Sequence, residues 1–406
     1  MINVLKNSWA LLLGVMLLML GNGMQGTLLG IRGALEGFDA GTMAWVMSGY
    51  FAGFLFGSRM TPWMIRQVGH VRVFAALGSL ISAVFILYAA VPDPWAWFGM
   101  RLVAGFCFSG VYVVSESWLN EASSNETRGQ AMSAYLIVQM VGIIASQYLM
   151  NFADANGYEL FVIMSVLVSL SFLPILLTTA PAPHYQATAP MSLARLFKVS
   201  PLGCVGAFLL GGVFAAIFAM APVYGTQKGM SVADISLFVA VIYTGGLLLQ
   251  YPLGWASDRM DRRILIVGMT GICALVMFVG YFLANSYAVL LVLGFVVGGT
   301  ANPLYSLLIA YTNDYLEPRD MASASGGLIF IDGLGALGGP FIVGWMMTHW
   351  GPDSFLLYVA FLMGLISTYG GYRMTRRRRR TVGGAAYVAV GPQATPTAVE
   401  AGLGQR

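Results

Sequence analysis

The chain has 406 residues, of which 58% are hydrophobic and only 9% are charged. A water-soluble protein carries about 25% charged residues, because its surface must face water. The charged side chains are therefore too few to cover a globule, which excludes an ordinary soluble enzyme or binding module. The net charge of +4 does not indicate a nucleic-acid partner, since most Lys and Arg residues occupy short gaps between apolar segments.

Apolar runs of about 20 residues recur along the chain, and this length matches the thickness of a bilayer core. The runs are continuously apolar and do not alternate, so we expect helices rather than a β-barrel. The first run is longer than a signal-peptide core, and we expect it to be retained. About twelve transmembrane helices are expected, roughly at residues 8–31, 42–65, 73–92, 95–118, 130–151, 159–179, 201–223, 234–256, 264–284, 287–311, 322–347 and 354–372.

The placement of Lys and Arg predicts that both termini lie in the cytoplasm, and we expect the chain to be in the inner membrane. One side of the expected bundle holds only Arg32 and Lys228. The other side holds the run Arg376–Arg380 and most of the remaining basic residues: Arg66, Arg72, Arg128, Arg195, Lys198, Arg259, Arg262, Arg263, Arg319 and Arg373. We interpret the arginine run as a topology anchor, with binding of anionic lipid or a partner as the alternative.

Four segments are expected along the chain. A six-helix bundle spans residues 1–180, and a cytoplasmic linker follows at residues 181–200. A second six-helix bundle spans residues 201–375, and a basic, then disordered tail spans residues 376–406.

The two bundles resemble each other in sequence when the chain is shifted by about 190 residues. At an offset of 193, four residues of the first half (Gly105, Tyr112, Asn120 and Glu121) fall on Gly298, Tyr305, Asn313 and Asp314. A parallel repeat of six helices predicts two bundles around a pseudo-twofold axis along the membrane normal. A substrate would then bind between the bundles, near the midplane.

Two motifs resemble those of a known family. Residues 254–263 read GWASDRMDRR and resemble the loop signature G-x-x-x-D-R-x-G-R-R of the major facilitator superfamily, between its eighth and ninth helices. The first-half copy of this loop is degraded, with Pro62 for the first glycine and Arg66 for the aspartate. Residues 101–105 resemble the R-x-x-x-G signature of the family's fourth helix.

The resemblance covers roughly residues 5–375. Within the superfamily, the chain is similar to a poorly characterised bacterial branch near the sugar and drug effluxers. The resemblance implies the major facilitator fold, a transport function and a monomer. It also associates the arginine of the fourth helix, here Arg101, with proton transfer.

The loop with the signature contains a candidate cytoplasmic latch. Asp258 follows a helix end and can pair with Arg262 or Arg263, and Arg259 lies in the same basic loop. Such pairs can hold the two halves in one state and must break in the other. The alternative is a permanently solvated loop whose charges only set the topology.

Three ionisable residues inside the expected spans are candidates for proton coupling or gating. An ionisable group in the bilayer costs several kcal/mol unless it faces a cavity or a partner. Asp332 lies about ten residues into the eleventh helix, Arg101 lies in the outer half of the fourth, and Glu116 lies near that helix's cytoplasmic end. The alternative is a structural hydrogen-bond acceptor for Asp332, and a cation that bonds carbonyls or snorkels outwards for Arg101. Glu116 is either a member of a gating ion pair or a plain interfacial carboxylate, and Arg66, Arg72 or Arg128 could neutralise it. His70 is expected in a loop and is no candidate.

Uncharged polar residues within the spans are candidates for the wall of a substrate cavity. Amide and phenol groups can bind a hydroxylated or zwitterionic solute, although each can equally bond a neighbouring helix. The candidates are Asn22, Gln25, Tyr112, Gln139, Tyr243, Gln250, Asn302 and Tyr305.

The leading hypothesis is a secondary transporter that exports a small organic solute by alternating access, coupled to protons. The alternatives are import, uncoupled uniport, and a non-transporting membrane sensor or scaffold that keeps the fold. The sequence has no HExxH, nucleophile elbow, P-loop or Cys/His ligand set. We therefore expect no enzymatic activity, cofactor or metal. The expected partners are the solute, membrane lipid and protons, but no nucleic acid.

Overall fold

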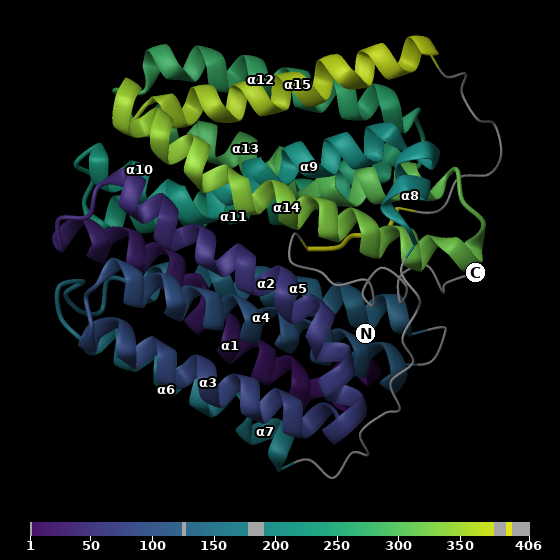
Figure 1. Ribbon diagram of the computed structural model, residues 1–406. Helices are drawn as coiled ribbons and strands as arrows, with labels where there is room; N and C mark the ends of the chain where they lie inside the picture. Colours follow the sequence, from purple (N-terminus) through teal and green to yellow (C-terminus); the bar gives the residue numbers. More distant parts are fainter. Residues whose placement is uncertain (1, 124–126, 178–190, 377–386, 392–406) are drawn as a thin grey trace. The chain divides into compact units, whose positions relative to one another are not determined.

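The computed structural model describes residues 2–123, 127–177, 191–376 and 387–391, and these residues form helices and no strands (Figure 1). Eleven helical segments are long and apolar enough to cross a membrane. A further helix, α2 (Ala40–Val68), coincides with the expected second span and has 29 residues, although it is not among the eleven. The all-α membrane fold is confirmed, and the helices are consistent with the expected twelve.

The described chain divides into two compact units, and unit 1 comprises residues 2–123, 127–177 and 219–240. In it α2 packs on α4, α1 packs on α5, α6 and α10, and α3 packs on α4 and α6. The helices of unit 1, apart from α2, are α1 (Ile2–Leu35), α3 (His70–Ala90), α4 (Pro94–Ala122), α5 (Arg128–Leu149), α6 (Glu159–Ser171), α7 (Leu173–Leu176) and α10 (Ala221–Gln227).

Unit 2 comprises the described residues 191–218, 241–376 and 387–391. In it α9 packs on α14, α13 and α15, and α12 packs on α15 and α13. Its helices are α8 (Leu193–Val199), α9 (Pro201–Ala215), α12 (Arg262–Leu283), α13 (Tyr287–Asn313), α14 (Pro318–Trp350) and α15 (Ser354–Arg376). Helix α11 (Val232–Ser257) contributes its first nine residues, through Ala240, to unit 1 and the rest to unit 2.

The expected linker contains an ordered helix. Helix α8 begins after Ser192, whose hydroxyl accepts a hydrogen bond from the Arg195 amide. Leu196 is buried, and the Arg195 side chain forms a salt bridge of 2.7 Å with Asp320 of α14. Residues 178–190 of the linker and four arginines of the basic run, 377–380, lie outside the described residues.

Close helix contacts occur at equivalent positions of the sequence repeat. A Cβ added to Gly105 of α4 would overlap the carbonyl oxygen of Tyr50 on α2. A Cβ added to Gly298 of α13 would overlap the carbonyl oxygen of Ile242 on α11 in the same way. Glycine is therefore required at both positions, since any side chain would force the two helix backbones apart.

The seventh span is broken where the chain passes from one unit to the other. Helix α9 ends at Ala215, a π-helical turn (η1) covers Ala216–Met220, and α10 continues at Ala221. The boundary between unit 2 and unit 1 falls inside this turn, between Phe218 and Ala219. Pro222, near the start of α10, lacks the N–H that a continuous helix would use.

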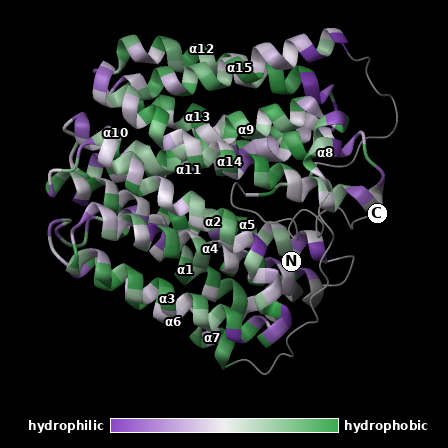
Figure 2. Ribbon diagram, viewed as in Figure 1, coloured by the Kyte–Doolittle hydropathy of each residue, from purple (hydrophilic) through white to green (hydrophobic). Residues whose placement is uncertain are grey.

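The outer surface of the helices is apolar, as a lipid-facing surface must be. Along α12, the side chains of Ile272, Leu275 and Phe282 are each more than 60% exposed. Hydrophobic colour runs along the helices and polar colour concentrates near their ends (Figure 2). This surface would aggregate in water, and it fits a bilayer.

Candidate transport site

Asp332 is a buried carboxylate in α14, the fifteenth residue of a 33-residue helix. It is only 7% exposed, and its Oδ1 atom has no hydrogen-bond partner among the residues that the structure describes. The α14 backbone at this point lies directly against α9, where a Cβ added to Gly211 would overlap the Asp332 carbonyl oxygen. The chain therefore places an acid in mid-helix without the hydrogen bonds that would make it purely structural.

Arg101 is a buried cation on α4 with an aromatic environment. The side chain is 4% exposed, and its guanidinium carbon lies 4.8 Å from the centre of the Tyr50 ring on α2. The Tyr88 hydroxyl of α3 also lies close enough to interact with its charge. Nε has no hydrogen-bond partner, and no described residue forms an ion pair with the guanidinium.

Amide side chains of α1 connect this cluster to the two neighbouring helices. Gln25 is buried and donates a hydrogen bond of 3.1 Å to the Tyr88 hydroxyl. Asn22, one turn earlier, donates a hydrogen bond of 3.0 Å to the Tyr112 hydroxyl of α4. The structure thus brings together four residues singled out in the sequence: Arg101, Gln25, Asn22 and Tyr112.

Glu116 lies apart from this cluster, towards the other end of α4. Its carboxylate is fully buried and lies close to the Tyr135 hydroxyl on α5. Arg128, considered in the sequence as a basic partner of Glu116, donates instead to the carbonyl oxygen of Asn120.

The expectation for His70 was wrong. It begins α3 and is buried, with Nε2 2.9 Å from the Ser117 hydroxyl of α4. A polar contact between residues 47 positions apart leaves no signal in the sequence.

The candidate cavity residues of unit 2 pack with aromatic and small polar neighbours. Tyr243 of α11 stacks on Phe218 with the ring centres 4.9 Å apart, and Tyr305 of α13 meets Phe214 edge-on at 6.0 Å. Asn302 is fully buried, donates to the Gly298 carbonyl, and has no described partner for Oδ1. Gln139 of α5, in unit 1, is half-buried.

The loop after α11 forms an ion-pair network within unit 2. Arg262 donates to Asp258 at 3.3 Å and also pairs closely with Asp314, the residue after the last position of α13. Arg263 pairs instead with Asp261 at 2.7 Å, and Arg259 lies over the Trp255 ring at 4.2 Å.

The partner of Arg262 that sequence reasoning missed is Asp314. The internal repeat had already aligned Asp314 with Glu121. An acidic residue at the end of both equivalent helices was therefore the sequence signal that could have identified Asp314 as a partner.

Two residues of the described tail segment 387–391, Tyr387 and Val390, contact other parts of unit 2. The Tyr387 amide donates a hydrogen bond of 3.0 Å to Asp258 Oδ1. The Val390 amide donates to the Ser306 hydroxyl at 3.0 Å, and that hydroxyl donates to the Val390 carbonyl at 3.1 Å. Ser306 also accepts a hydrogen bond of 3.1 Å from the candidate cavity residue Gln250. The tail thus contacts groups from both the candidate latch and the candidate cavity.

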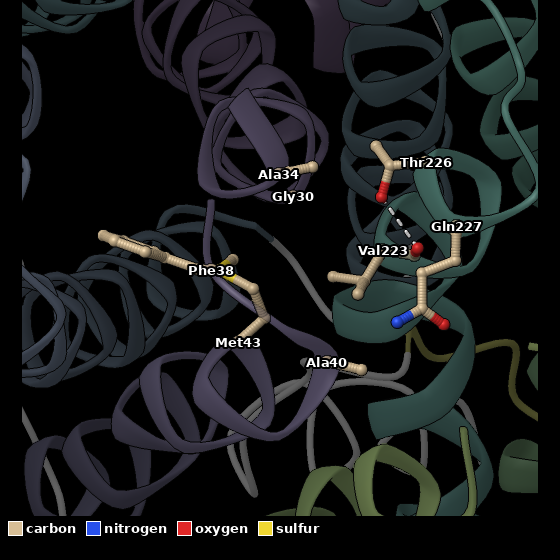
Figure 3. Close-up of a pocket in the computed structure, with 8 residues that line it drawn as sticks. All are labelled: Gly30, Ala34, Phe38, Ala40, Met43, Val223, Thr226 and Gln227. Atoms are coloured by element: carbon tan, nitrogen blue, oxygen red, sulfur yellow. Dashed lines mark hydrogen bonds between the residues drawn. The ribbon is translucent and has the colours of Figure 1, made fainter. Parts of the chain in front are cut away.

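A small pocket lies in unit 1 where α1 and α2 meet α10 (Figure 3). Its volume of about 80 Å³ holds two or three water molecules and no organic solute. Thr226 at its wall donates to the Val223 carbonyl at 2.8 Å. The lining residues are Gly30, Ala34, Phe38, Ala40, Met43, Val223, Thr226 and Gln227.

An all-helical membrane protein with a lipid-facing surface and buried polar and charged clusters belongs to the class of solute transporters and channels. The sequence matches the Major Facilitator Superfamily over residues 11–246 and again over residues 203–386. The chain belongs to this superfamily, which confirms the resemblance and supports a role in membrane transport.

Among curated relatives, the chain is 26% identical over 353 residues to a protein of Escherichia coli O7:K1 named "Uncharacterized MFS-type transporter YcaD". The alignment covers 86% of this chain and 91% of the relative. A Salmonella arizonae protein of the same name is 24% identical over 352 residues, with the same coverage.

Solved structures share the fold at low identity. The nucleoside transporter NupG superposes with a TM-score of 0.73 at 16% identity, over 92% of this chain and 100% of that one. A bacterial homologue of the lysosomal transporter Spinster, in an inward-facing and unoccupied conformation, gives 0.75 at 14% identity, over 93% and 99%. A D-xylose–proton symporter gives 0.69 at 15% identity, over 90% and 96%. These likenesses show the fold alone.

Proposed function

We propose that this transporter exports a small organic solute across the bacterial inner membrane in exchange for protons, by alternating access. Both termini lie in the cytoplasm in this proposal, as the distribution of Lys and Arg indicates. The protein acts as a monomer and needs no cofactor or metal. The two six-helix segments, residues 1–180 and 201–375, are the moving bundles.

The observation that carries the proposal is the buried, unsatisfied carboxylate of Asp332. An ionised carboxylate buried among helices costs several kcal/mol, and the cost falls when the group takes up a proton. Oδ1 has no hydrogen-bond partner in the described part of the chain, so this oxygen is free to take up a proton. Such a group can take a proton from one side of the membrane and release it to the other.

Packing within unit 1 supports the alternating step. The segment 219–240 comes from the second half of the sequence but packs with the first-half helices. A Cβ added to Gly30 of α1 would lie 2.7 Å from Cβ of Pro222 on α10. We propose that this contact closes the outer end of the solute path and separates when the path opens outwards. The π-helical turn before α10 supplies a bend at the same point.

The pairing of Arg262 with Asp258 and Asp314 supports a role for the loop network as a latch at the cytoplasmic end. Its ion pairs would stabilise one state and break in the other. Glu116 beside Tyr135 is a second gating candidate. An uncoupled uniporter, an importer and a non-transporting sensor remain the competing functions.

The experiment is a proton-flux measurement in inverted membrane vesicles that contain the protein. Sugars, amino acids, organic acids and cationic drugs are added in turn after a pH gradient is imposed. We expect one class to dissipate the gradient with wild-type protein and not with Asp332→Asn at matched expression. Labelled-solute flux without proton movement would instead establish uniport, and no flux for any class would favour the sensor.

A further inference from the structure

We infer that the transported solute carries a carboxylate and that Arg101 binds it within unit 1. This inference rests on the proposed transport function and names the substrate class. In the described part of the chain, the charge of Arg101 has no nearby acidic residue to balance it. Glu116 is the one acidic residue in the described helices of unit 1 that lies outside a first or last helical turn. It is fifteen residues from Arg101 on the same straight helix, which corresponds to about 22 Å.

The donors of Arg101 are available to an anion. A guanidinium presents five N–H groups in a planar fork that matches the two oxygens of a carboxylate. Nε has no partner, and the buried Tyr50 hydroxyl, which lies close to Asn22 and Tyr112, makes no hydrogen bond of standard geometry in the described ranges. The face of the Tyr50 ring, whose centre lies 4.8 Å from the guanidinium carbon of Arg101, stabilises this charge less than a counter-ion would. A bound carboxylate would satisfy the charge and these donors together.

Aromatic rings beside the cation define the rest of the solute. The Phe54 ring is half-buried, and its centre lies 6.2 Å from that of Tyr50 and 6.1 Å from that of Tyr112. Phe108 completes the group at 6.3 Å from both tyrosines. Such a surface favours a flat or apolar body. The geometry therefore points to an aromatic or apolar monocarboxylate, and the uncompensated cation disfavours cationic solutes.

The test compares isosteric probes on purified, full-length protein by ligand-induced thermal stabilisation. We expect benzoate, phenylacetate or salicylate to stabilise the wild type, whereas benzamide and benzylamine do not. Arg101→Gln should weaken carboxylate binding about tenfold or more, and Arg101→Lys by less. Arg72→Gln, at an exposed position on α3, is the matched control and should bind normally. Tyr50→Phe keeps the ring and removes the hydroxyl, so it should give an intermediate loss even if Arg101→Gln does not fold.

The inference is overturned if none of the three carboxylates stabilises the protein, or if benzamide or benzylamine does so equally. It is also overturned if both Arg101→Gln and Tyr50→Phe bind carboxylates as well as the wild type. Proton-linked flux of a neutral or cationic solute would leave the proposed function intact and remove this inference. Carboxylate binding through Arg101 without any flux would contradict the proposed function and leave only the carboxylate-binding site.

A second, independent inference concerns the C-terminal residues 387–391, which we call the strap. We propose that the strap docks on α11 and α13 and occludes the polar groups of unit 2. The Ser306 hydroxyl accepts from Gln250 and from the Val390 amide, and it donates to the Val390 carbonyl. A hydroxyl has one donor and two acceptor sites, so the strap completes its hydrogen bonding.

The other end of the strap reaches the candidate latch. Asp258 Oδ1 accepts from both the Tyr387 amide and Arg262. The Tyr387 ring packs on α11 where a Cβ added to Gly254 would lie 2.6 Å from it. Val390 is 5% exposed. Val390 is buried, Tyr387 is half-buried, and three hydrogen bonds hold the segment, so we infer that it is docked on unit 2.

The occluding role is tested without knowledge of the substrate. Gln250→Cys places a thiol beneath the strap, in a chain whose native cysteines (Cys107, Cys204 and Cys273) are all buried. Its alkylation by N-ethylmaleimide is compared between a chain stopped after Ala386, which lacks the strap, and one stopped after Gly391, which keeps it. We expect alkylation several-fold faster without the strap. Equal rates would overturn the inference.

A second measurement does not depend on the Gln250→Cys substitution. Amide hydrogen exchange in the full chain should show the 387–391 peptide protected, and Asp258→Ala combined with Ser306→Ala should remove the protection. An unprotected peptide in the full chain would also overturn the inference.

Discussion

The guanidinium of Arg101 lies over the ring of Tyr50, with the charge centre 4.8 Å from the ring centre, and this contact joins α4 to α2. The two residues lie beside the close contact between Gly105 and the Tyr50 carbonyl. The face of a tyrosine ring attracts a cation by about 2 kcal/mol when both are desolvated. The ring therefore offsets part of the cost of burying Arg101 in the absence of a bound anion.

Replacing Tyr50 tests this stabilisation. We expect Tyr50→Leu to lower the free energy of unfolding by about 2 kcal/mol, since it removes the ring face that the cation contacts. Tyr50→Phe retains the ring face and should cost less than half as much. Reversible denaturation in mixed micelles measures both. Equal losses for the two variants would mean that the ring does not stabilise the cation.

The close helix contacts at Gly105 and Gly298 predict that substitution of either glycine lowers the stability of the protein. Gly105→Ala and Gly298→Ala should each destabilise the protein by about 2 kcal/mol or more, because the added methyl group meets a backbone carbonyl that cannot move alone. Gly99→Ala, on the same helix as Gly105, places its methyl group in open space and is the matched control. Its expected effect is neutral or slightly stabilising. Thermal unfolding of the three variants tests this prediction. A loss of stability in Gly99→Ala as large as in the other two variants would contradict it.

Arg262 should be the most sensitive residue of the basic loop. Arg262→Ala leaves Asp314 without its ion pair and also removes hydrogen bonds to the Ala310 carbonyl and the Ser257 hydroxyl. The expected loss of stability is about 3 kcal/mol. The control is Arg259→Ala, since Arg259 is exposed and contacts only Trp255 in the described structure; it should cost below about 1 kcal/mol. Similar losses for the two variants would show that the Arg262 network is not cooperative.

Because Asp39 caps the N-terminus of α2, we expect the stability of this helix to depend on pH. Hydrogen bonds from Thr42 at the helix N-terminus hold the pKa of Asp39 below its usual value near 3.8. The cap therefore stabilises the fold fully above that value and is lost as the pH falls through the lower, folded-state pKa. Asp39→Ala should cost about 1 kcal/mol at neutral pH and less near pH 3, while Asp39→Asn should show no such trend. A penalty for Asp39→Ala that grows on acidification would contradict this assignment.

The sequence predicted the helices well because a span is a local property. About 20 apolar residues between charged gaps leave no alternative to a membrane helix. The sequence did not predict features that depend on packing, such as the π-helical break at Ala216–Met220, which lies inside a uniformly apolar run. The short helix α8 was also missed, because seven residues within a polar linker carry too little periodicity to be recognised.

The candidate site was only partly foreseeable for the same reason. Asp332 and Arg101 stand out because a charge within an apolar run is conspicuous in any sequence. Tyr50 and Tyr88 do not stand out, since tyrosine is common in membrane helices, and only the fold shows that they surround Arg101.

The central claim, proton-coupled transport through Asp332, is tested most directly in proteoliposomes containing purified protein. Accumulation of a labelled solute against its gradient is driven by an imposed pH gradient, and solute exchange is measured separately without a gradient. We expect Asp332→Asn to abolish the driven accumulation while it retains exchange, because the carrier still alternates but no longer moves a proton. Wild-type levels of proton-driven accumulation in Asp332→Asn would contradict the account.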